Sequence, residues 1–132
     1  MPQSISRNIR CAASMILLCW LLLVSDTVIS LPHGAEIMHG AVNISSDLPG
    51  NHMRIEAGDG SIIQYENFDI QSFESVQFVQ PSASSRVLNR VLGPDPTQIL
   101  GKLMSNGQLY LVNPAGIIFG EGSIVDVGGM FA

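Results

Sequence analysis

Hydrophobic residues occur at every second position in several short segments of the chain from residue 31 onward. Segments 41–45 and 53–57 alternate in this way, which indicates β-strands with one buried face. Further short runs are rich in β-branched and aromatic residues and are also predicted to be strands: 61–65, 75–79, 108–112, 116–119 and 123–127. Residues 84–92 come closest to the periodicity of an amphipathic helix, but a Gly-Pro pair follows them directly. The pattern therefore predicts an all-β domain.

Glycine-rich turns separate these segments, and a turn followed by a strand occurs three times, beginning at Asp59-Gly60, Asn106-Gly107 and Glu121-Gly122. We expect the Asn-Gly pair in particular to be a turn. The intervals of 47 and 15 residues between these units show no regular period. They are compatible with a solenoid of about 20–25 residues per coil, and equally with a β-sandwich. The spacing leaves both architectures open.

The first thirty residues have the organisation of a secretory signal peptide. Arg7 and Arg10 precede an apolar run over residues 11–24, and small and polar residues follow it. The run is shorter than the ~20 apolar residues that a membrane-spanning helix needs. We expect cleavage after Ser30, with an uncleaved anchor or a lipid anchor at Cys19 as the alternatives. Residues 1–30 are then the leader, and residues 31–132 form one domain.

Removal of the leader changes what the composition means. Both cysteines lie in the leader, so the mature chain has no disulfide to stabilise it. Residues 31–132 carry four basic and ten acidic side chains, a formal net charge of −6. A basic nucleic-acid-binding surface is therefore excluded as a default expectation.

Motifs of enzymes and metal sites are absent from the sequence. There is no Gly-x-Ser-x-Gly elbow, and the Gly101-Lys102 pair lacks the Ser or Thr that completes a phosphate-binding loop. The histidines are six and thirteen residues apart, unlike a compact zinc set. We expect a domain that is not an enzyme and that binds neither a cofactor nor a metal.

The segment from Arg86 to Phe131 carries an ordered set of motifs. They are Asn89-Arg90-Val91, Ile99-Leu100-Gly101-Lys102-Leu103, Ser105-Asn106-Gly107, Asn113-Pro114-Ala115-Gly116 and Ser123-Ile124-Val125. In this order they resemble the amino-terminal secretion domain of filamentous haemagglutinin-like exoproteins, the two-partner secretion family. The resemblance extends over residues 31–132 and is strongest from Arg86 onward.

The resemblance implies a right-handed parallel β-helix, a solenoid with short extra strands in its N-terminal part. The family pattern runs on past residue 132, so the domain is expected to be truncated at its C-terminus. The family implies export by the general secretory machinery and recognition in the periplasm by the periplasmic modules of an outer-membrane β-barrel transporter. It further implies a parent protein that is secreted or displayed at the cell surface, an adhesin or haemagglutinin that contacts a host or neighbouring cell. A strand of the partner that adds to an exposed sheet edge is the expected mode of recognition.

The same resemblance supplies the candidate site. Residues 113–116 correspond to the Asn-Pro-Asn-Gly signature of the family, and residues 89–90 to its upstream Asn-Arg element. Ala115 departs from the signature, which has a second asparagine there. The transporter-recognition residues are therefore expected to be Asn89, Arg90, Asn113, Pro114 and Gly116. A plain structural interpretation stays open for both groups: a type I turn at residues 113–116, and a solvated loop pair at residues 89–90.

Three phenylalanines, five residues apart, fit neither a helix nor one face of a strand: Phe68, Phe73 and Phe78. They are expected either to cap the core or to form an apolar docking surface.

Two rival functions remain. The chain can be a self-contained secreted adhesin that binds carbohydrate or a cell surface, or a truncated remnant without activity. The adhesins of the family carry their binding regions far beyond this length, which favours the secretion signal.

Overall fold

The computed structural model describes residues 31–47 and 50–132, so the predicted signal peptide and its cleavage site lie outside the described residues. The described residues form ten strands and no helix. The strands are β1 (Glu36–His39), β2 (Val42–Ser46), β3 (His52–Ala57), β4 (Ser61–Tyr65), β5 (Ser75–Val79), β6 (Arg86–Val91), β7 (Thr97–Ile99), β8 (Lys102–Val112), β9 (Ile117–Phe119) and β10 (Ile124–Phe131). The prediction of an all-β domain is confirmed.

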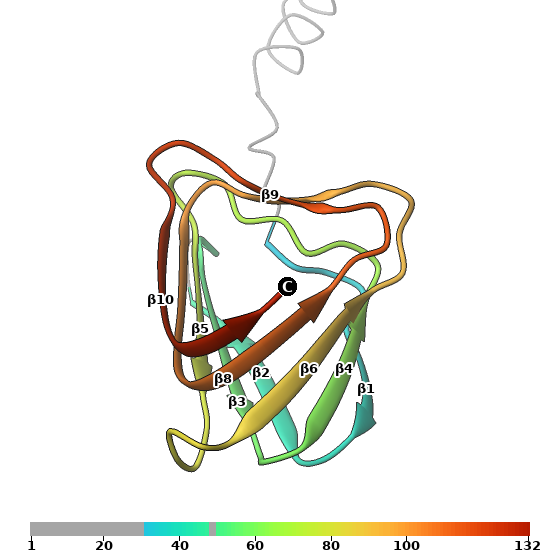
Figure 1. Cartoon of the computed structure of the whole chain (residues 1–132), viewed down its shortest axis with the longest axis vertical. Helices are drawn as coiled ribbons and strands as arrows, with labels where there is room; N and C mark the ends of the chain where they lie inside the picture. The colour runs from blue at the N-terminus through green and yellow to red at the C-terminus, as the bar shows by residue number, and fades with distance from the viewer. Residues whose placement is uncertain (1–30, 48–49) are drawn as a thin grey trace, which may run out of the picture.

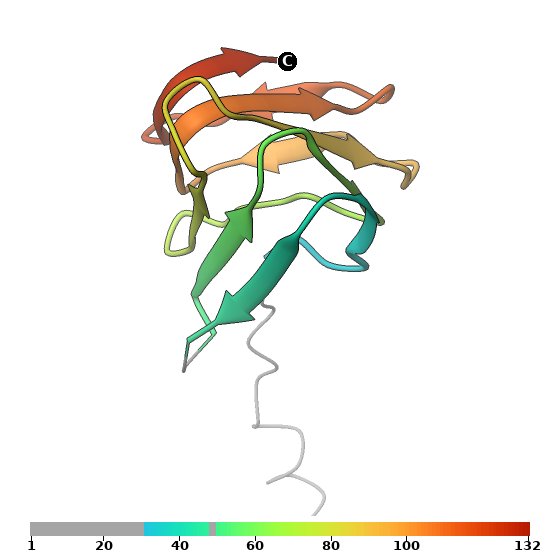
Figure 2. The ribbon, with the colours of Figure 1, turned by 90° about the horizontal axis from the view of Figure 1, so that it is seen from below.

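Parallel pairing stacks these strands into a solenoid of about four coils. On one side, β3 pairs with β5, β5 with the first half of β8, and β8 with β10, all parallel. On the second side, β4 pairs with β6 and β6 with the second half of β8, again parallel. The third side holds the short parallel pair β7–β9. Figure 1 shows the three sides, and Figure 2 shows the coils stacked from the N-terminal strands to the C-terminus.

Successive coils begin at residues 52, 75, 102 and 124, which are register partners along the first side. The coils are thus 23, 27 and 22 residues long, close to the expected repeat. Parallel neighbours with these long crossovers exclude the sandwich that the sequence left open, because a sandwich is built from antiparallel strands.

Two antiparallel strands close the N-terminal end of the solenoid. β1 pairs antiparallel with β4, and β2 pairs antiparallel with β3. These are the short extra strands expected from the resemblance, and Figure 2 shows them at the end opposite the C-terminus. The remaining edges of β1 and β2 form the two ends of the strand order.

Inward-facing residues of all three sides fill the solenoid. Period-two alternation is clear in β4 and β6, where every second residue is buried. Fifteen buried hydrophobic residues form one cluster: Leu31, Ile55, Ala57, Ile63, Tyr65, Phe68, Ile70, Val76, Phe78, Val87, Val91, Ile99, Leu103, Leu109 and Leu111. The coils that begin at residues 52, 75 and 102 all contribute to this cluster, and Val127 and Met130 of the last coil pack against it, so no coil buries its apolar residues alone.

The structure clarifies two local features, and one expectation was wrong. Residues 84–92, which come closest to helical periodicity, mostly form strand β6, whose outward Leu88 adds an apolar residue to the second face. The Asn106-Gly107 pair is not a turn between strands but lies inside β8, where one continuous strand passes from the first side to the second. A Cβ at Gly107 would lie 2.7 Å from the end of the Gln80 side chain, which would then have to shift.

Candidate functional site

The Asn-Pro-Ala-Gly corner joins the end of β8 to β9. The Gly116 N–H donates to the Asn113 carbonyl oxygen at 3.0 Å, which closes the four-residue turn. The Ala115 N–H donates to Asn113 Oδ1 at 2.9 Å, so the side chain of the asparagine closes a second ring in the same turn. Gly116 has φ of 108°, a conformation that side chains disfavour. The expected turn is therefore confirmed.

The asparagine of this corner also holds the coil beneath it. Asn113 Nδ2 donates to the Asp95 carbonyl oxygen at 3.0 Å and to Thr97 Oγ1 at 2.9 Å. The Thr97 N–H in turn donates to the Gly116 carbonyl oxygen at 3.0 Å. Both amide protons of a buried side chain thus bond to the preceding coil, and they fix the corner on its neighbour.

The other residues of the corner face away from the core. Pro114, Ala115 and Gly116 are all exposed. The turn uses only the backbone of Ala115, so it forms without the second asparagine of the signature. The proline ring and the backbone of this corner therefore lie on the outer surface.

Asn89 and Arg90 lie in strand β6, so the interpretation as a solvated loop pair was wrong. Asn89 is completely buried, and its Oδ1 accepts a hydrogen bond from the Tyr65 hydroxyl at 3.1 Å. Its Nδ2 donates to the Tyr110 carbonyl oxygen at 3.2 Å. Burial raises the pKa of the Tyr65 hydroxyl, which keeps it protonated as a donor. Asn89 therefore connects three coils and is inaccessible to a partner.

Arg90, in contrast, points outward and is exposed. It is the register partner of Val112, the residue immediately before Asn113. The structure thus brings Arg90 next to the Asn-Pro-Ala-Gly corner on the outer surface and leaves Asn89 inside the solenoid.

Further corner contacts were not foreseen from the sequence. Asp59 Oδ1 accepts from the Arg86 N–H at 2.9 Å, and Asp69 Oδ1 accepts from the Gln98 N–H at 2.8 Å. Asn106 pairs with the backbone of Gln80 through both ends of its amide, each at 2.7 Å. In each case a polar side chain completes the hydrogen bonding between coils where the chain bends. The signal in the sequence is an Asp or Asn one coil length from its partner, and it becomes visible only when the coil length is known.

The three phenylalanines do not act together. Phe68 and Phe78 are core residues with ring centroids 6.4 Å apart, and Phe68 also packs edge-on against Tyr65 at 5.1 Å. Phe73 is 62% exposed. The expectation of one shared cap or docking surface was wrong, because the loop between β4 and β5 turns Phe73 outward.

Potential metal ligands do not converge in the part of the chain that the structure describes: no group of three His, Cys, Asp or Glu is placed to hold an ion. The described residues also contain no helix long and apolar enough to span a membrane. Among the histidines, His52 Nδ1 lies 2.5 Å from Ser75 Oγ on the neighbouring strand.

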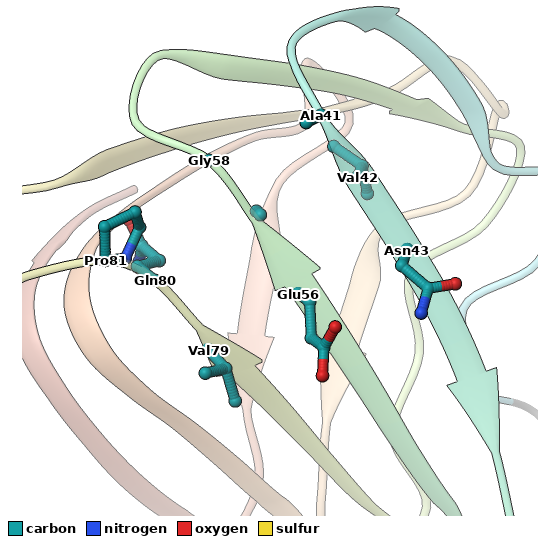
Figure 3. Close-up of a pocket in the computed structure, with 9 residues that line it drawn as sticks. Ala41, Val42, Asn43, Glu56, Gly58, Val79, Gln80 and Pro81 are labelled. Carbon is teal, nitrogen blue, oxygen red and sulfur yellow. The ribbon is translucent and has the colours of Figure 1, made fainter.

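A shallow groove of about 490 Å³ lies near the N-terminal end, beside the start of β2 and the ends of β3 and β5. Figure 3 shows Asn43, Glu56 and Val79 on these three neighbouring strands. Asn43 and Glu56 are register partners, as are Glu56 and Val79. The groove therefore crosses the three neighbouring strands β2, β3 and β5.

Comparison with known proteins gives a consistent result. The family model of the TPS secretion domain matches residues 38–132. A heme/hemopexin-binding protein of Haemophilus influenzae strain Rd is 41% identical over 103 residues, which are 77% of this chain and 11% of that protein. A second heme/hemopexin-binding protein of Haemophilus influenzae is 34% identical over 101 residues, 76% of this chain and 11% of that protein.

A solved structure agrees with these sequence relatives. The crystal structure of the HMW1 secretion domain from Haemophilus influenzae has a TM-score of 0.72 and 36% identity, and the match covers 75% of this chain and 26% of that one. The chain spans about a tenth of the length of the curated relatives it matches. Together with the parallel solenoid and the Asn-Pro-Ala-Gly corner, these matches show that the chain belongs to the TPS secretion domain family, the secretion domains of two-partner-secreted exoproteins.

Proposed function

We propose that residues 31–132 are the part of a two-partner-secreted exoprotein that its outer-membrane transporter recognises in the periplasm. The observation that carries the proposal is the match of residues 38–132 to a secretion domain, at 36% identity to the HMW1 secretion domain of known structure. The general secretory machinery delivers the chain to the periplasm, and the leader is removed after Ser30. The domain acts by recognition and not as an enzyme, as its relatives are secretion domains.

Strand addition at β2 is the mode of contact that we favour. At one end of the β2–β3 pair the Gly58 N–H donates to the Ala41 carbonyl oxygen, and at the other end the Asp47 N–H donates to the His52 carbonyl oxygen. Because hydrogen-bonded positions alternate in an antiparallel pair, every second residue of β2 directs its backbone groups away from β3. These outward residues are Val42, Ile44 and Ser46. A strand of the transporter can bond to them and extend the sheet beyond β2.

A proline at Ser46 tests this contact, because it removes an outward N–H at the end of β2 and leaves the bonds to β3 in place. We expect Ser46→Pro to weaken binding of the full chain to the detergent-solubilised transporter several-fold, the order of one lost hydrogen bond. Ser46→Ala keeps the N–H and should bind like the parent chain. Titration by fluorescence anisotropy measures both. Equal affinity of the two variants would remove the β2 edge from the interface.

The activity of the parent protein is a separate proposal. Its relatives are named for heme and hemopexin binding, which favours an exoprotein that binds heme or hemopexin over an adhesin or haemagglutinin. Contact with a host or neighbouring cell surface remains the alternative. Capture of the secreted full-length exoprotein on immobilised hemopexin, compared with adhesion of cells that display it, separates the two functions.

A further inference from the structure

The outer face of the second side of the solenoid carries an apolar row that the recognition mode above does not use. Register pairing aligns four outward residues of successive strands: Ile62 on β4, Leu88 on β6, Tyr110 on β8 and Phe131 on β10. We call them the outer apolar row. The rings of Tyr110 and Phe131 stack with centroids 4.5 Å apart, and Phe131 is 53% exposed. Ile62, Leu88 and Tyr110 are half-buried.

The surface beside this row is concave. A hollow of about 340 Å³ is lined by Gly60, Ser61, Ile62, Arg86, Leu88 and Tyr110. Three of the four residues of the row thus form one side of a depression, with an arginine at its margin. A row with a hollow beside it offers more contact area to a rod-shaped partner than a flat strand surface does.

Two arginines flank the row. Arg86 and Arg90 are exposed and lie on either side of Leu88 on the outer face of β6. Within the described residues neither guanidinium forms an ion pair, and the one salt bridge joins Arg54 to Glu56. The outward residues of β4, β6 and the second half of β8 include no carboxylate. Acidic residues lie at the margins: Asp59 Oδ1 accepts from the Arg86 N–H, and Glu36 is the register partner of Gln64.

This charge distribution indicates what kind of surface the partner presents. Residues 31–132 carry a net charge of −6, yet two of their four cations border this one row. A second copy of the chain docked through the same face would bring arginines against arginines. The complementary surface is therefore apolar in the middle and acidic at its borders.

The spacing of the row indicates the shape of that surface. Neighbouring strands lie about 4.8 Å apart, so the four side chains advance by about 4.8 Å per step. One turn of an α-helix rises about 5.4 Å, whereas same-face residues of a strand are about 6.7 Å apart. Over three steps the mismatch is about 2 Å for a helix and about 6 Å for a strand. A helix that lies across the strands keeps its apolar stripe in contact with the whole row.

We propose that the outer apolar row is a second docking surface for the transporter, and that it receives an amphipathic helix of a periplasmic module with carboxylates beside its aliphatic stripe. This inference rests on the proposed function, since it names the same partner. It adds a contact on a different side of the solenoid from the β2 edge.

Strand β8 supplies matched controls, because its first half faces outward on the other side of the solenoid. Met104 is half-buried and outward like Leu88, and Lys102 is an exposed outward cation like the arginines. The test pairs are Leu88→Gln with Met104→Gln, and the double variant Arg86→Glu/Arg90→Glu with Lys102→Glu. The arginines are solvent-exposed, so the charge variants fold even where an apolar substitution perturbs the sheet.

The experiment measures the affinity of each full-chain variant for the detergent-solubilised transporter at low and high salt. We expect Leu88→Gln and the double arginine variant to weaken binding at least tenfold, with both controls within twofold of the parent chain. Added salt should weaken the parent and not the arginine variant. If the parent binds the transporter and all variants bind equally, the docking surface is wrong and the proposed function stands. If the parent fails to bind, the proposed function fails and this inference with it. Self-association of the parent that Leu88→Gln abolishes, without any effect on transporter binding, would also overturn the inference in favour of a second copy.

Discussion

At the scale of single residues, asparagines in this molecule serve as connectors between coils. Asn113 bonds to Asp95 and Thr97 of the preceding coil, and Asn89 bonds to Tyr65 and to the backbone of Tyr110. A buried amide that loses its partners costs more than the same amide in water, so these residues fix which coil positions face each other. The family signature therefore has a structural basis at Asn113 that does not depend on contact with a partner.

The substitution Asn113→Ala tests this connection. It leaves the Asp95 carbonyl and the Thr97 hydroxyl without their donor, and it removes the bond to the Ala115 N–H. We expect the free energy of unfolding to fall by about 2–4 kcal/mol, since each unsatisfied buried group costs about 1–3 kcal/mol. Urea denaturation followed by circular dichroism measures the change.

Its control is Ala115→Asn, which restores the family signature at an exposed position two residues away. We expect a change within about 0.5 kcal/mol, as for other surface substitutions. If Asn113→Ala were as stable as Ala115→Asn, the asparagine would have no structural role and its place in the signature would have to come from contact with the transporter.

At the scale of elements, the corners must stack as closely as the strands. Gly101 shows this most clearly, because a Cβ on it would lie 2.2 Å from the carbonyl oxygens of both Gln71 and Glu74 in the preceding coil. Gly116 differs, since a Cβ there meets nothing within 4 Å and only its φ of 108° disfavours a side chain. A comparison of the two glycines therefore separates the cost of close packing from the cost of backbone conformation.

We expect Gly101→Ala to be the more damaging of the two substitutions. The clash is with backbone atoms that cannot move without opening the coil contact, so a loss of more than about 3 kcal/mol or failure to fold is expected. Gly116→Ala should cost about 1 kcal/mol through its positive φ. Thermal unfolding of both variants distinguishes the outcomes, and equal melting temperatures would show that the corner at Gly101 relaxes freely.

Much of the element order could be predicted from the sequence, and the failures have a common cause. β4 and β5 were predicted at their observed bounds, because a single buried face leaves a clear alternation. β6 was not, because outward Leu88 belongs to an apolar row on the outer surface and hides the alternation. The corner inside β8 was mistaken for a turn, because a solenoid bends a paired strand where a sandwich would end it.

The candidate site, too, could be predicted only in part from the sequence. The turn at residues 113–116 follows from local chemistry, since Asn, Pro and Gly each favour their positions in it. The bonds of Asn113 to Asp95 and Thr97 depend on which coil positions are stacked, and this register is not visible in a single sequence. The burial of Asn89 escaped prediction for the same reason, because a polar residue in a strand is ordinarily assigned to the outer face.

At the scale of the whole molecule, the solenoid is stabilised by the stacking of its coils and not by cross-links. Residues 31–132 contain no cysteine, and the core is one apolar cluster to which successive coils contribute. Each coil can therefore pack on the one before it without a disulfide. Both proposed contact surfaces, the β2 edge and the outer apolar row, lie on the outside of this stack, where the core does not depend on them.

Secretion measured with and without the transporter tests the central claim most directly. Residues 1–132 followed by a reporter domain are expressed in a Gram-negative host, with the cognate transporter present or absent, and the reporter is quantified in the medium and the periplasm. The account predicts that the reporter reaches the medium only when the transporter is present, and stays in the periplasm otherwise. A reporter that remains in the periplasm despite a functional transporter, or that enters the medium equally well without it, would contradict the assignment of this solenoid as the secretion signal.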